Sequence, residues 1–218
     1  MTTPTILILA GKRDGTPGAL ADLPAVQALK ADGRLTVSVA RDTLVQSIEA
    51  AVAEPAMRWP LLITTGDNVL ITPEALRDVH RFGEEQGAGA LLCLAHKPDV
   101  LAAHPEGQRN FYRFRDAEIA NCNTYWLRDA GTLKATEAFR EGGQFMKNRD
   151  RIARAFGYLN LAAFALGLLS VNRAMARISR RMGVNIRAYR FTDGAYAIDV
   201  DNERTYKVCE QLLAIRKP

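Results

Sequence analysis

A short apolar run that breaks into a basic, glycine-rich loop is the feature that most constrains the fold of this chain. Residues 6–9 are four aliphatic side chains in a row, and a loop at 10–15 follows directly. A run this short is typical of a strand that is buried on both faces, as in a parallel sheet. Glycines at the carboxyl end of such a strand let a ligand approach the backbone, and Lys12 and Arg13 add positive charge. The pattern predicts a candidate phosphate-binding loop, with an ordinary turn and a solvated basic tip as the alternative.

The remaining sequence alternates between strand patterns and helix patterns. Thr72-Pro73-Glu74 is a typical helix start, with Thr72 as N-cap and proline in the first turn. Repeated strand–helix units favour a Rossmann-like three-layer sandwich with a mostly parallel sheet, and segments 111–114 and 123–127 are expected to add a β-hairpin to it. The patterns predict strands at 5–9, 35–40, 60–65, 89–95, 110–115, 118–128 and 186–191, and helices at 22–32, 43–53, 73–86, 129–141, 147–169, 171–183 and 202–214.

The composition is that of an ordinary globular protein, with 48% hydrophobic and 24% charged residues among 218. We expect one domain spanning residues 1–218. The net charge of +5 is moderate, and no basic run is interleaved with aromatic residues, so a nucleic-acid partner is not indicated. Cys93, Cys122 and Cys209 lie far apart without metal-ligand spacing, and we expect them to be buried apolar residues in a reducing cytoplasm.

Two aspartates stand next to the ends of predicted elements. Asp67 follows the predicted strand 60–65 after Gly66, and Asp201 precedes the predicted helix 202–214. In open α/β sheets ligands bind beyond the carboxyl ends of the strands, where these carboxylates could face a metal ion. The alternative is that each aspartate merely caps a helix, a role that aspartate often fills. Together with the glycine-rich loop, the two aspartates favour the metal-binding interpretation.

Three segments carry a resemblance to a known family. Nucleotidyltransferases with the GT-A-type fold, the MobA-like NTP transferases among them, have an N-terminal signature similar to Leu9-Ala10-Gly11-x-Arg13-x-Gly15. Residues 61–68 resemble the strand of that family that ends in G-D-x-P, and residues 197–203 resemble its late D-[IV]-D-T-P-E-D signature. The three segments follow the family order across nearly the whole chain. Asn121-Cys122-Asn123 also lies where the family often has an N-x-G-like substrate strand.

The resemblance implies a Mg²⁺-dependent NTP transferase in which two carboxylates, Asp67 and Asp201, hold the metal and Asp199 is a reserve ligand. Magnesium prefers hard oxygen ligands and keeps several waters, so two carboxylates suffice. Arg13, Asp67 and Asp201 are the expected catalytic residues. The nucleotide, with CTP or GTP as the leading candidates, is expected on Leu9, Ala10, Gly11, Arg13, Gly15, Gly66 and Asp67.

The chain departs from the family pattern after its glycine-rich loop. The family continues with a K-x-L-x-P-[VI]-x-G-[KR]-P-[ML] segment whose lysine neutralises triphosphate charge, but no lysine stands between Gly15 and Leu29 here. Either this segment is deleted, or an unresolved loop has been left out of the numbering, and we favour the second interpretation. An acceptor phosphate that is already ionised needs neither a general base nor a covalent nucleophile. Accordingly, His80, His96 and His104, which lack ligand spacing, are expected to be structural or surface residues.

The acceptor side rests on weaker patterns. Asn121 and Asn123 lie two apart on a predicted strand and so face one side, where they could bind substrate or simply make a hairpin edge polar. Lys147 could bind the acceptor phosphate or lie at a solvated helix start. A helical acceptor-side segment is expected at about 147–183. Its apolar stretch, 156–171, is flanked by arginines and is too short to span a bilayer, so it forms either a buried helix or a surface for a lipid-like acceptor or an anionic membrane.

The sequence therefore predicts an enzyme that transfers an NMP unit from an NTP to a phosphorylated small-molecule or lipid-head-group acceptor with release of pyrophosphate. A glycosyltransferase that uses Asp199-Val200-Asp201 as a D-x-D metal motif is one alternative. A nucleotide-binding domain without catalysis is another. We expect a cytoplasmic protein, with peripheral membrane contact as an open alternative.

Overall fold

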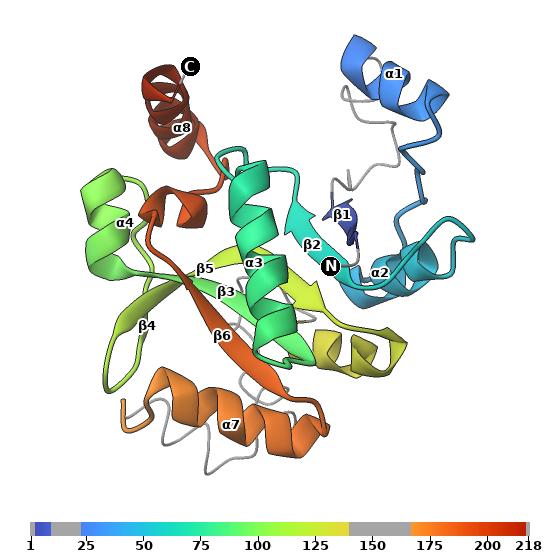
Figure 1. The fold of residues 1–218 in the computed structure, drawn as a ribbon. Helices are drawn as coiled ribbons and strands as arrows, with labels where there is room; N and C mark the ends of the chain where they lie inside the picture. The colour runs from blue at the N-terminus through green and yellow to red at the C-terminus, as the bar shows by residue number, and fades with distance from the viewer. Residues whose placement is uncertain (1–2, 10–22, 140–166, 217–218) are drawn as a thin grey trace.

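The computed structural model describes residues 3–9, 23–139 and 167–216, and its centre is an open β-sheet (Figure 1). The strands follow the order β1-β2-β5-β3-β6, and β4 pairs with β5 off this path. β1 and β2 pair in parallel, as do β3 and β6, whereas β5 runs antiparallel to both of its neighbours. The bounds are β1 (Thr5–Leu9), β2 (Leu61–Thr65), β3 (Ala90–His96), β4 (Tyr112–Arg113), β5 (Glu118–Leu127) and β6 (Ile186–Phe191).

The predicted β-hairpin forms, but its second strand is not an addition at the edge of the sheet. β4 pairs with the start of β5 through Tyr112–Ile119 and Arg113–Glu118. β5 then continues between β2 and β3, where it is the central strand of the five-strand path. The strand signals of the sequence locate β5, whereas its place in the sheet depends on pairing between distant segments.

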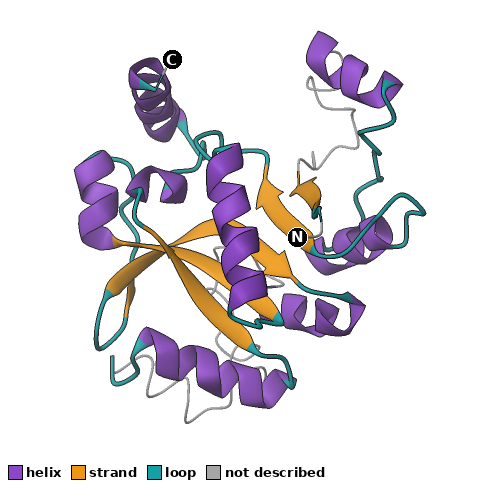
Figure 2. Ribbon diagram, viewed as in Figure 1, coloured by secondary structure: helices purple, strands orange, loops and turns teal. Residues whose placement is uncertain are grey.

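Helices cover both faces of the sheet, which confirms the predicted three-layer α/β class (Figure 2). On one face, side chains of α3 (Pro73–Glu85), α4 (Lys97–Ala103), the 3₁₀ turn η3 (Gly194–Ala197) and α8 (Glu203–Ile215) pack around Trp126. On the other face, α2 (Leu44–Val52), the 3₁₀ helix η2 (Ala130–Phe139) and α7 (Val171–Met182) pack around Tyr125 and Leu127. Alternate residues of the central strand β5 thus enter opposite halves of the core.

α3 packs directly on β5 at a point where a glycine faces the central strand. A Cβ atom added to Gly83 would stand 2.8 Å from the Trp126 ring. The indole Nε1 of Trp126 donates a hydrogen bond of 3.2 Å to Nδ1 of His80, also on α3. His80 therefore has a structural role, as expected, and His104 bonds Gln211 at 3.1 Å near the surface. Cys93, Cys122 and Cys209 are free and buried, as expected.

The N-terminal segment departs most from the sequence prediction. The predicted strand at 35–40 does not form, and Val37 and Val39 are 71% and 73% exposed. α1 (Pro24–Ala31) forms but buries none of its residues. β1 is not buried on both faces, because Ile6 and Ile8 are at least half exposed. Leu7 and Leu9 do pack against the core on the other face of β1.

Further corrections concern local structure. The predicted helix at 129–141 is a 3₁₀ helix, and residues 167–169 form no helix. α4 and η3 were not predicted. The amino-acid sequence itself runs from Gly15 to Leu29 without the lysine-bearing family segment, so the interpretation that a loop was left out is wrong. Ala10, Gly11, Arg13, Gly15, Lys147 and most of the helix predicted at 147–169 lie outside the described residues. No helix in the described part of the chain is long and apolar enough to cross a membrane.

Candidate active site

Backbone hydrogen bonds bring the described parts of the three resembling segments together at one edge of the sheet. The amide of Gly66 donates to the carbonyl of Leu9 at 3.1 Å, so the chain after β2 lies beside the end of β1. The amide of Val200 donates to the carbonyl of Asp67 at 3.0 Å. Segments that lie far apart in the sequence thus meet beyond the carboxyl ends of β1 and β2, where open α/β sheets bind ligands.

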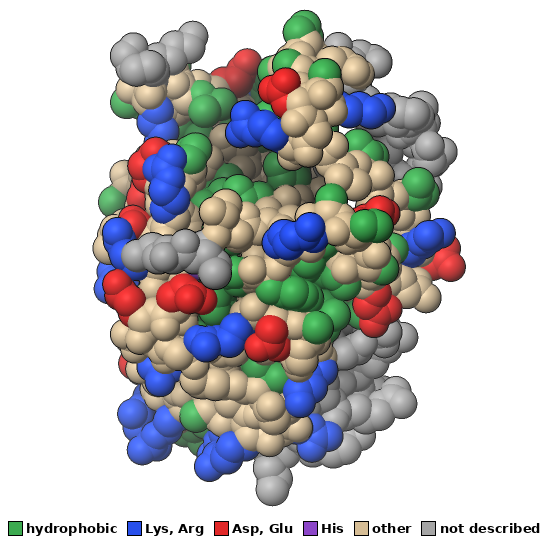
Figure 3. Space-filling model, turned by 45° about the vertical axis from the view of Figure 1, so that its right-hand side comes forward, with side chains coloured by type: hydrophobic (Ala, Val, Ile, Leu, Met, Phe, Trp, Pro, Cys, Tyr) green, Lys and Arg blue, Asp and Glu red, His purple; other side chains and the backbone are tan. Residues whose placement is uncertain are grey.

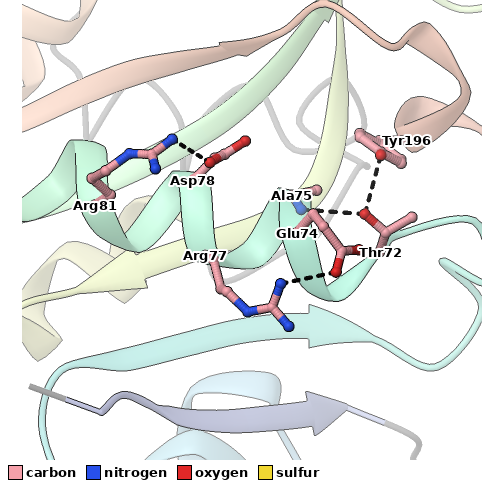
Figure 4. A network of polar contacts seen from close by, with 7 residues as sticks. All are labelled: Thr72, Glu74, Ala75, Arg77, Asp78, Arg81 and Tyr196. Carbon is pink, nitrogen blue, oxygen red and sulfur yellow. Dashed lines mark hydrogen bonds and ion pairs between the residues drawn. The ribbon is translucent and has the colours of Figure 1, made fainter.

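Polar contacts around the first turn of α3 fix the two aspartate-bearing loops to each other (Figure 4). Thr72 Oγ1 accepts a hydrogen bond from the amide of Ala75 at 3.2 Å, which caps α3. The same oxygen lies 3.3 Å from the hydroxyl of Tyr196 on η3. Because Tyr196 comes shortly before Asp199, this contact joins the loop after β2 to the loop before α8.

The helix α3 is further supported by ion pairs between neighbouring turns, Arg77 with Glu74 and Arg81 with Asp78.

Arg216 makes a second connection between the same two loops from the end of α8. Its Nη1 donates to the carbonyl of Leu70 at 2.8 Å, and its Nη2 pairs with the carboxylate of Asp193. The guanidinium also lies over the Tyr196 ring, 5.3 Å from its centroid. A single side chain therefore holds the segment after Asp67 and the segment before Asp199 in place.

Asp199 is the most deeply buried carboxylate of the site, with 8% of the residue exposed. Its Oδ2 accepts a hydrogen bond of 2.6 Å from Nδ2 of Asn123, while its Oδ1 has no partner among the described residues. Burial, followed by the negative charges of Asp67 and Asp201, raises the pKa of Asp199 to about 7, against the lowering effect of Asn123. Positive charge placed beside Asp199 would therefore stabilise its ionised carboxylate.

Asp67 and Asp201 lie close enough to raise the pKa of Asp199, and neither of them caps a helix. The N-cap of α3 is Thr72, and the N-cap of α8 is Asn202, whose side chain accepts from the amides of Arg204 and Thr205. The helix-capping alternative is therefore wrong for both aspartates. Asp67 Oδ1 is buried without a partner among the described residues. Partial burial and then the charge of Asp67 raise the pKa of Asp201, which the guanidinium of Arg204 lowers.

Asn123 reaches Asp199 because β5 is irregular at that point. The register between β3 and β5 shifts between Leu92 and Leu94, and Asn123 has a left-handed backbone with a φ of 45°. Asparagine tolerates this conformation better than most residues do. The side chains of Asn121 and Asn123 meet, as their spacing predicted: Nδ2 of Asn121 donates to Oδ1 of Asn123 at 2.9 Å and to the Tyr125 hydroxyl at 2.8 Å. Burial raises the pKa of Tyr125, which keeps it a neutral phenol.

Sequence reasoning missed two polar residues at this edge. Asn68 is buried and donates to the carbonyl of Cys122 at 2.7 Å, but its Oδ1 has no partner among the described residues. Nη1 of Arg204 is likewise buried without such a partner. Both could have been found, because each stands within one of the resembling segments or directly after it. The hydroxyls of Thr64 and Thr65, at the end of β2, complete this set of unsatisfied atoms.

The residues fit a divalent cation only in part on their own. Among the described residues no three His, Cys, Asp or Glu side chains form a ready cluster for a metal ion. The buried oxygens of Asp67 and Asp199 that have no partner among the described residues are nevertheless hard, negatively charged ligands. The carboxylates also repel one another, and a bound cation would relieve this repulsion. Magnesium is often bound by one or two carboxylates together with substrate phosphates, and such a site is completed only when the substrate arrives. Figure 3 shows the surface hollowed in its upper part, at about the height at which β2 ends in Figure 1.

Comparison with known proteins supports the fold. No model of a known protein family matches the chain, and no curated protein matches it in sequence. A solved structure described as a hypothetical transferase from Thermus thermophilus matches 94% of this chain and 99% of its own, with a TM-score of 0.66 and 24% identity. At this identity the match shows a shared fold and nothing more. A CMP:2-keto-3-deoxy-manno-octonic acid synthetase complexed with CTP matches 89% of this chain and 77% of its own at 14% identity, but its TM-score of 0.44 is too low for any conclusion.

Proposed function

We propose that this protein is a Mg²⁺-dependent nucleotidyltransferase that transfers an NMP unit from CTP or GTP to a phosphorylated acceptor and releases pyrophosphate. The observation that carries the proposal is that the charges of Asp67 and Asp201 act on the buried carboxylate of Asp199 at the carboxyl edge of the sheet, while buried oxygens of Asp67 and Asp199 have no partner among the described residues. This arrangement joins the described ends of the three segments that resemble GT-A-type nucleotidyltransferases. The structural match over nearly the whole chain to a solved structure described as a transferase is consistent with the proposed function.

In this proposal Asp67 and Asp201 hold the magnesium ion, and Asp199 is the reserve ligand. The ion would neutralise charge on the triphosphate and stabilise the pyrophosphate that leaves. Asp199 must lose its proton to serve as a ligand, and Asn123 assists because its Nδ2 donates to the ionised carboxylate. The polar contacts of Thr72, Tyr196 and Arg216 keep the two aspartate loops at a fixed separation.

The nucleotide is assigned to the ends of β1 and β2. Gly66 is exposed, and its amide is hydrogen-bonded to the carbonyl of Leu9. At this position the carboxyl edge of the sheet therefore presents backbone rather than a side chain. Arg13 and the residues around it, Ala10, Gly11 and Gly15, remain predictions for the triphosphate. Arg204 adds a cation beside Asp201, with a buried Nη1 that a phosphate oxygen would satisfy. This arginine offers positive charge in a chain that lacks the lysine-bearing segment of the family.

The acceptor is assigned to the other side of the carboxylates. Asn121 and Asn123 are half-buried, Asn123 donates to Asp199, and Asn121 donates to Asn123. Their amides could orient acceptor hydroxyls or ribose that replace these hydrogen bonds. Lys147 remains the predicted contact for the acceptor phosphate. A phosphate acceptor is already an anion at neutral pH, so the site needs no general base among its side chains.

The experiment is an assay of pyrophosphate release from each of the four NTPs, with Mg²⁺ and a panel of phosphorylated sugars, alditols and alcohols. Asp67→Asn should abolish release, whereas Asp78→Asn, an isosteric change on the exposed face of α3, should leave it unchanged. Hydrolysis of nucleotide sugars, tested in parallel, distinguishes a glycosyltransferase. Release that survives in Asp67→Asn would contradict the proposal, as would turnover of nucleotide sugars without turnover of any NTP.

A further inference from the structure

Helix α7 carries an unusual concentration of positive charge. From Gly167 to Thr192 the sequence contains six arginines and no aspartate or glutamate. Four of the arginines lie on α7 itself, at 173, 177, 180 and 181. This helix does not belong to the edge of the sheet at which the aspartates meet, because it packs against the strand β6 and the opposite core.

The four arginines form one stripe along α7. At 100° per residue their side chains fall within an arc of about 100°, and they span about 12 Å of the helix. Met175 points to the opposite side of the helix and is buried against the sheet, and Ala174, beside the edge of the arc, is buried as well. Arg173, Arg180 and Arg181 are exposed, and Arg177 is half-buried. The packing of α7 therefore fixes the arginine stripe toward the outside of the molecule.

The described residues around α7 include both a basic and an acidic side chain. Lys134 on η2 is exposed and its Nζ lies close to Gly183 at the end of the helix. Asp116 is a nearby acid, and it accepts a hydrogen bond from the amide of Val171 at the opposite end. In Figure 3 the lowest part of the described surface, at the level of α7 in Figure 1, shows Lys and Arg side chains and no acidic ones. Among the described residues around α7, positive charge therefore exceeds negative charge.

We propose that the arginine stripe of α7, made by Arg173, Arg177, Arg180 and Arg181, binds the surface of an anionic phospholipid membrane. Guanidinium groups pair with phosphate in bidentate geometry, and clusters of four or more basic residues on an amphipathic helix are typical of anionic lipid binding. Leu168, which is 58% exposed, lies just before the N-terminal end of α7 and offers an apolar side chain to the membrane there. A nucleic acid is less well matched, because α7 has no aromatic side chain on which a base could stack.

The test is co-sedimentation of the full chain with vesicles of phosphatidylcholine alone or with roughly one-third phosphatidylglycerol, at roughly 0.1 M and 0.5 M salt. The stripe variant is Arg173→Glu with Arg180→Glu. The matched control is Arg77→Glu with Lys207→Glu, which makes the same change in net charge on exposed sites of α3 and α8. Arg173→Gln with Arg180→Gln serves if the charge reversal impairs folding, which circular dichroism will report.

We expect the protein to bind the anionic vesicles at low salt, to bind neutral vesicles weakly, and to be released at high salt. The stripe variant should bind at least about tenfold more weakly, since each basic residue near the surface raises the partition coefficient about fivefold. The control should lose about twofold or less. The proposal would be overturned if the protein did not bind anionic vesicles, or if the stripe variant and the control lost binding equally. It would also be overturned if single-stranded DNA bound the protein as well as the anionic vesicles do. Because vesicle binding is measured without nucleotide, its failure leaves the proposed nucleotidyl transfer untouched.

Discussion

Helices α1 and α3 follow similar sequence signals but have opposite fates in the structure. Each begins with a proline in its first turn, and each contains apolar residues at helical spacing. α3 buries Ala75, Leu76 and Val79 against the sheet, whereas α1 buries none of its residues. Figure 1 shows α3 lying across the sheet and α1 standing away from it. Local signals therefore specify where a helix forms, while its burial depends on a complementary surface elsewhere in the chain.

That complementary surface can be identified for α3. Gly83 removes the side chain that would collide with Trp126, and Thr72 caps the helix and contacts Tyr196. α1 has Leu23 as its N-cap, which makes no side-chain capping hydrogen bond. Its neighbours in sequence, Val37 and Val39, are exposed as well. The body formed by 61–127 and 171–215 thus carries the aspartates of the candidate site, and segment 23–41 contributes little burial.

The largest expected difference between the two regions is in amide hydrogen exchange. Amides of α3 should exchange only through global unfolding, which for a domain requires on the order of 5–15 kcal/mol. Amides of α1 should exchange through local opening at close to zero free energy. Exchange followed by mass spectrometry on peptides from both helices measures this contrast. Equal protection of α1 and α3 would mean that α1 is packed against the protein in solution.

A matched pair of substitutions sharpens the comparison. Leu91→Ala removes a fully buried side chain beneath α3 and should lower the free energy of unfolding by about 2–5 kcal/mol. Leu23→Ala makes the same change at a half-exposed position and should cost less than about 0.5 kcal/mol. Urea denaturation of both variants gives the two values. A large loss from Leu23→Ala would show that segment 23–41 contributes to the core.

Asp199 gives a smaller, pH-dependent effect that belongs to the body alone. Its pKa is raised from 3.8 to about 7 in the folded state, so the folded protein binds the extra proton between these values. The contribution of Asp199 to the free energy of unfolding therefore falls as the pH rises from about 4 to about 7 and is constant above that range. With EDTA present, Asp199→Asn should be more stable than the wild type at pH 8, and its advantage should vanish near pH 4. Thermal unfolding across this pH range measures it, and a constant offset would show that the site does not repel the ionised carboxylate.

Prediction from sequence succeeded where a segment carried its own signal. The strands β1, β2 and β6 and the helices α2, α3, α7 and α8 lie within a residue or two of their predicted bounds. The strand predicted at 35–40 failed although its residues alternate like a strand, because in the described residues no neighbouring strand pairs with it. α4 could have been foreseen in part, since Pro98 and Asp99 stand in its first turn as Pro73 and Glu74 do in α3, although its N-cap, His96, makes no side-chain capping hydrogen bond. The central place of β5 could not, because strand order is set by pairing between distant residues.

The candidate site was predictable in its parts but not in its connections. Asp67, Asp199 and Asp201 were found because aspartates after strands and in D-x-D order are conspicuous. The hydrogen bond from Asn123 to Asp199 depends on the irregularity of β5 and on a left-handed residue, neither of which leaves a pattern in sequence. The same is true of Arg216, which reaches Leu70 and Asp193 from the far end of α8.

The central claim is that a divalent cation and a nucleoside triphosphate bind together at Asp67, Asp199 and Asp201. Isothermal titration calorimetry of CTP and GTP into the protein, with Mg²⁺ or with EDTA, tests it most directly. We predict binding of at least one of them that is tenfold or more tighter with Mg²⁺, and loss of this difference in Asp67→Asn but not in Asp78→Asn. Equal affinity with Mg²⁺ and with EDTA, or a Mg²⁺ effect that persists in Asp67→Asn, would contradict the account.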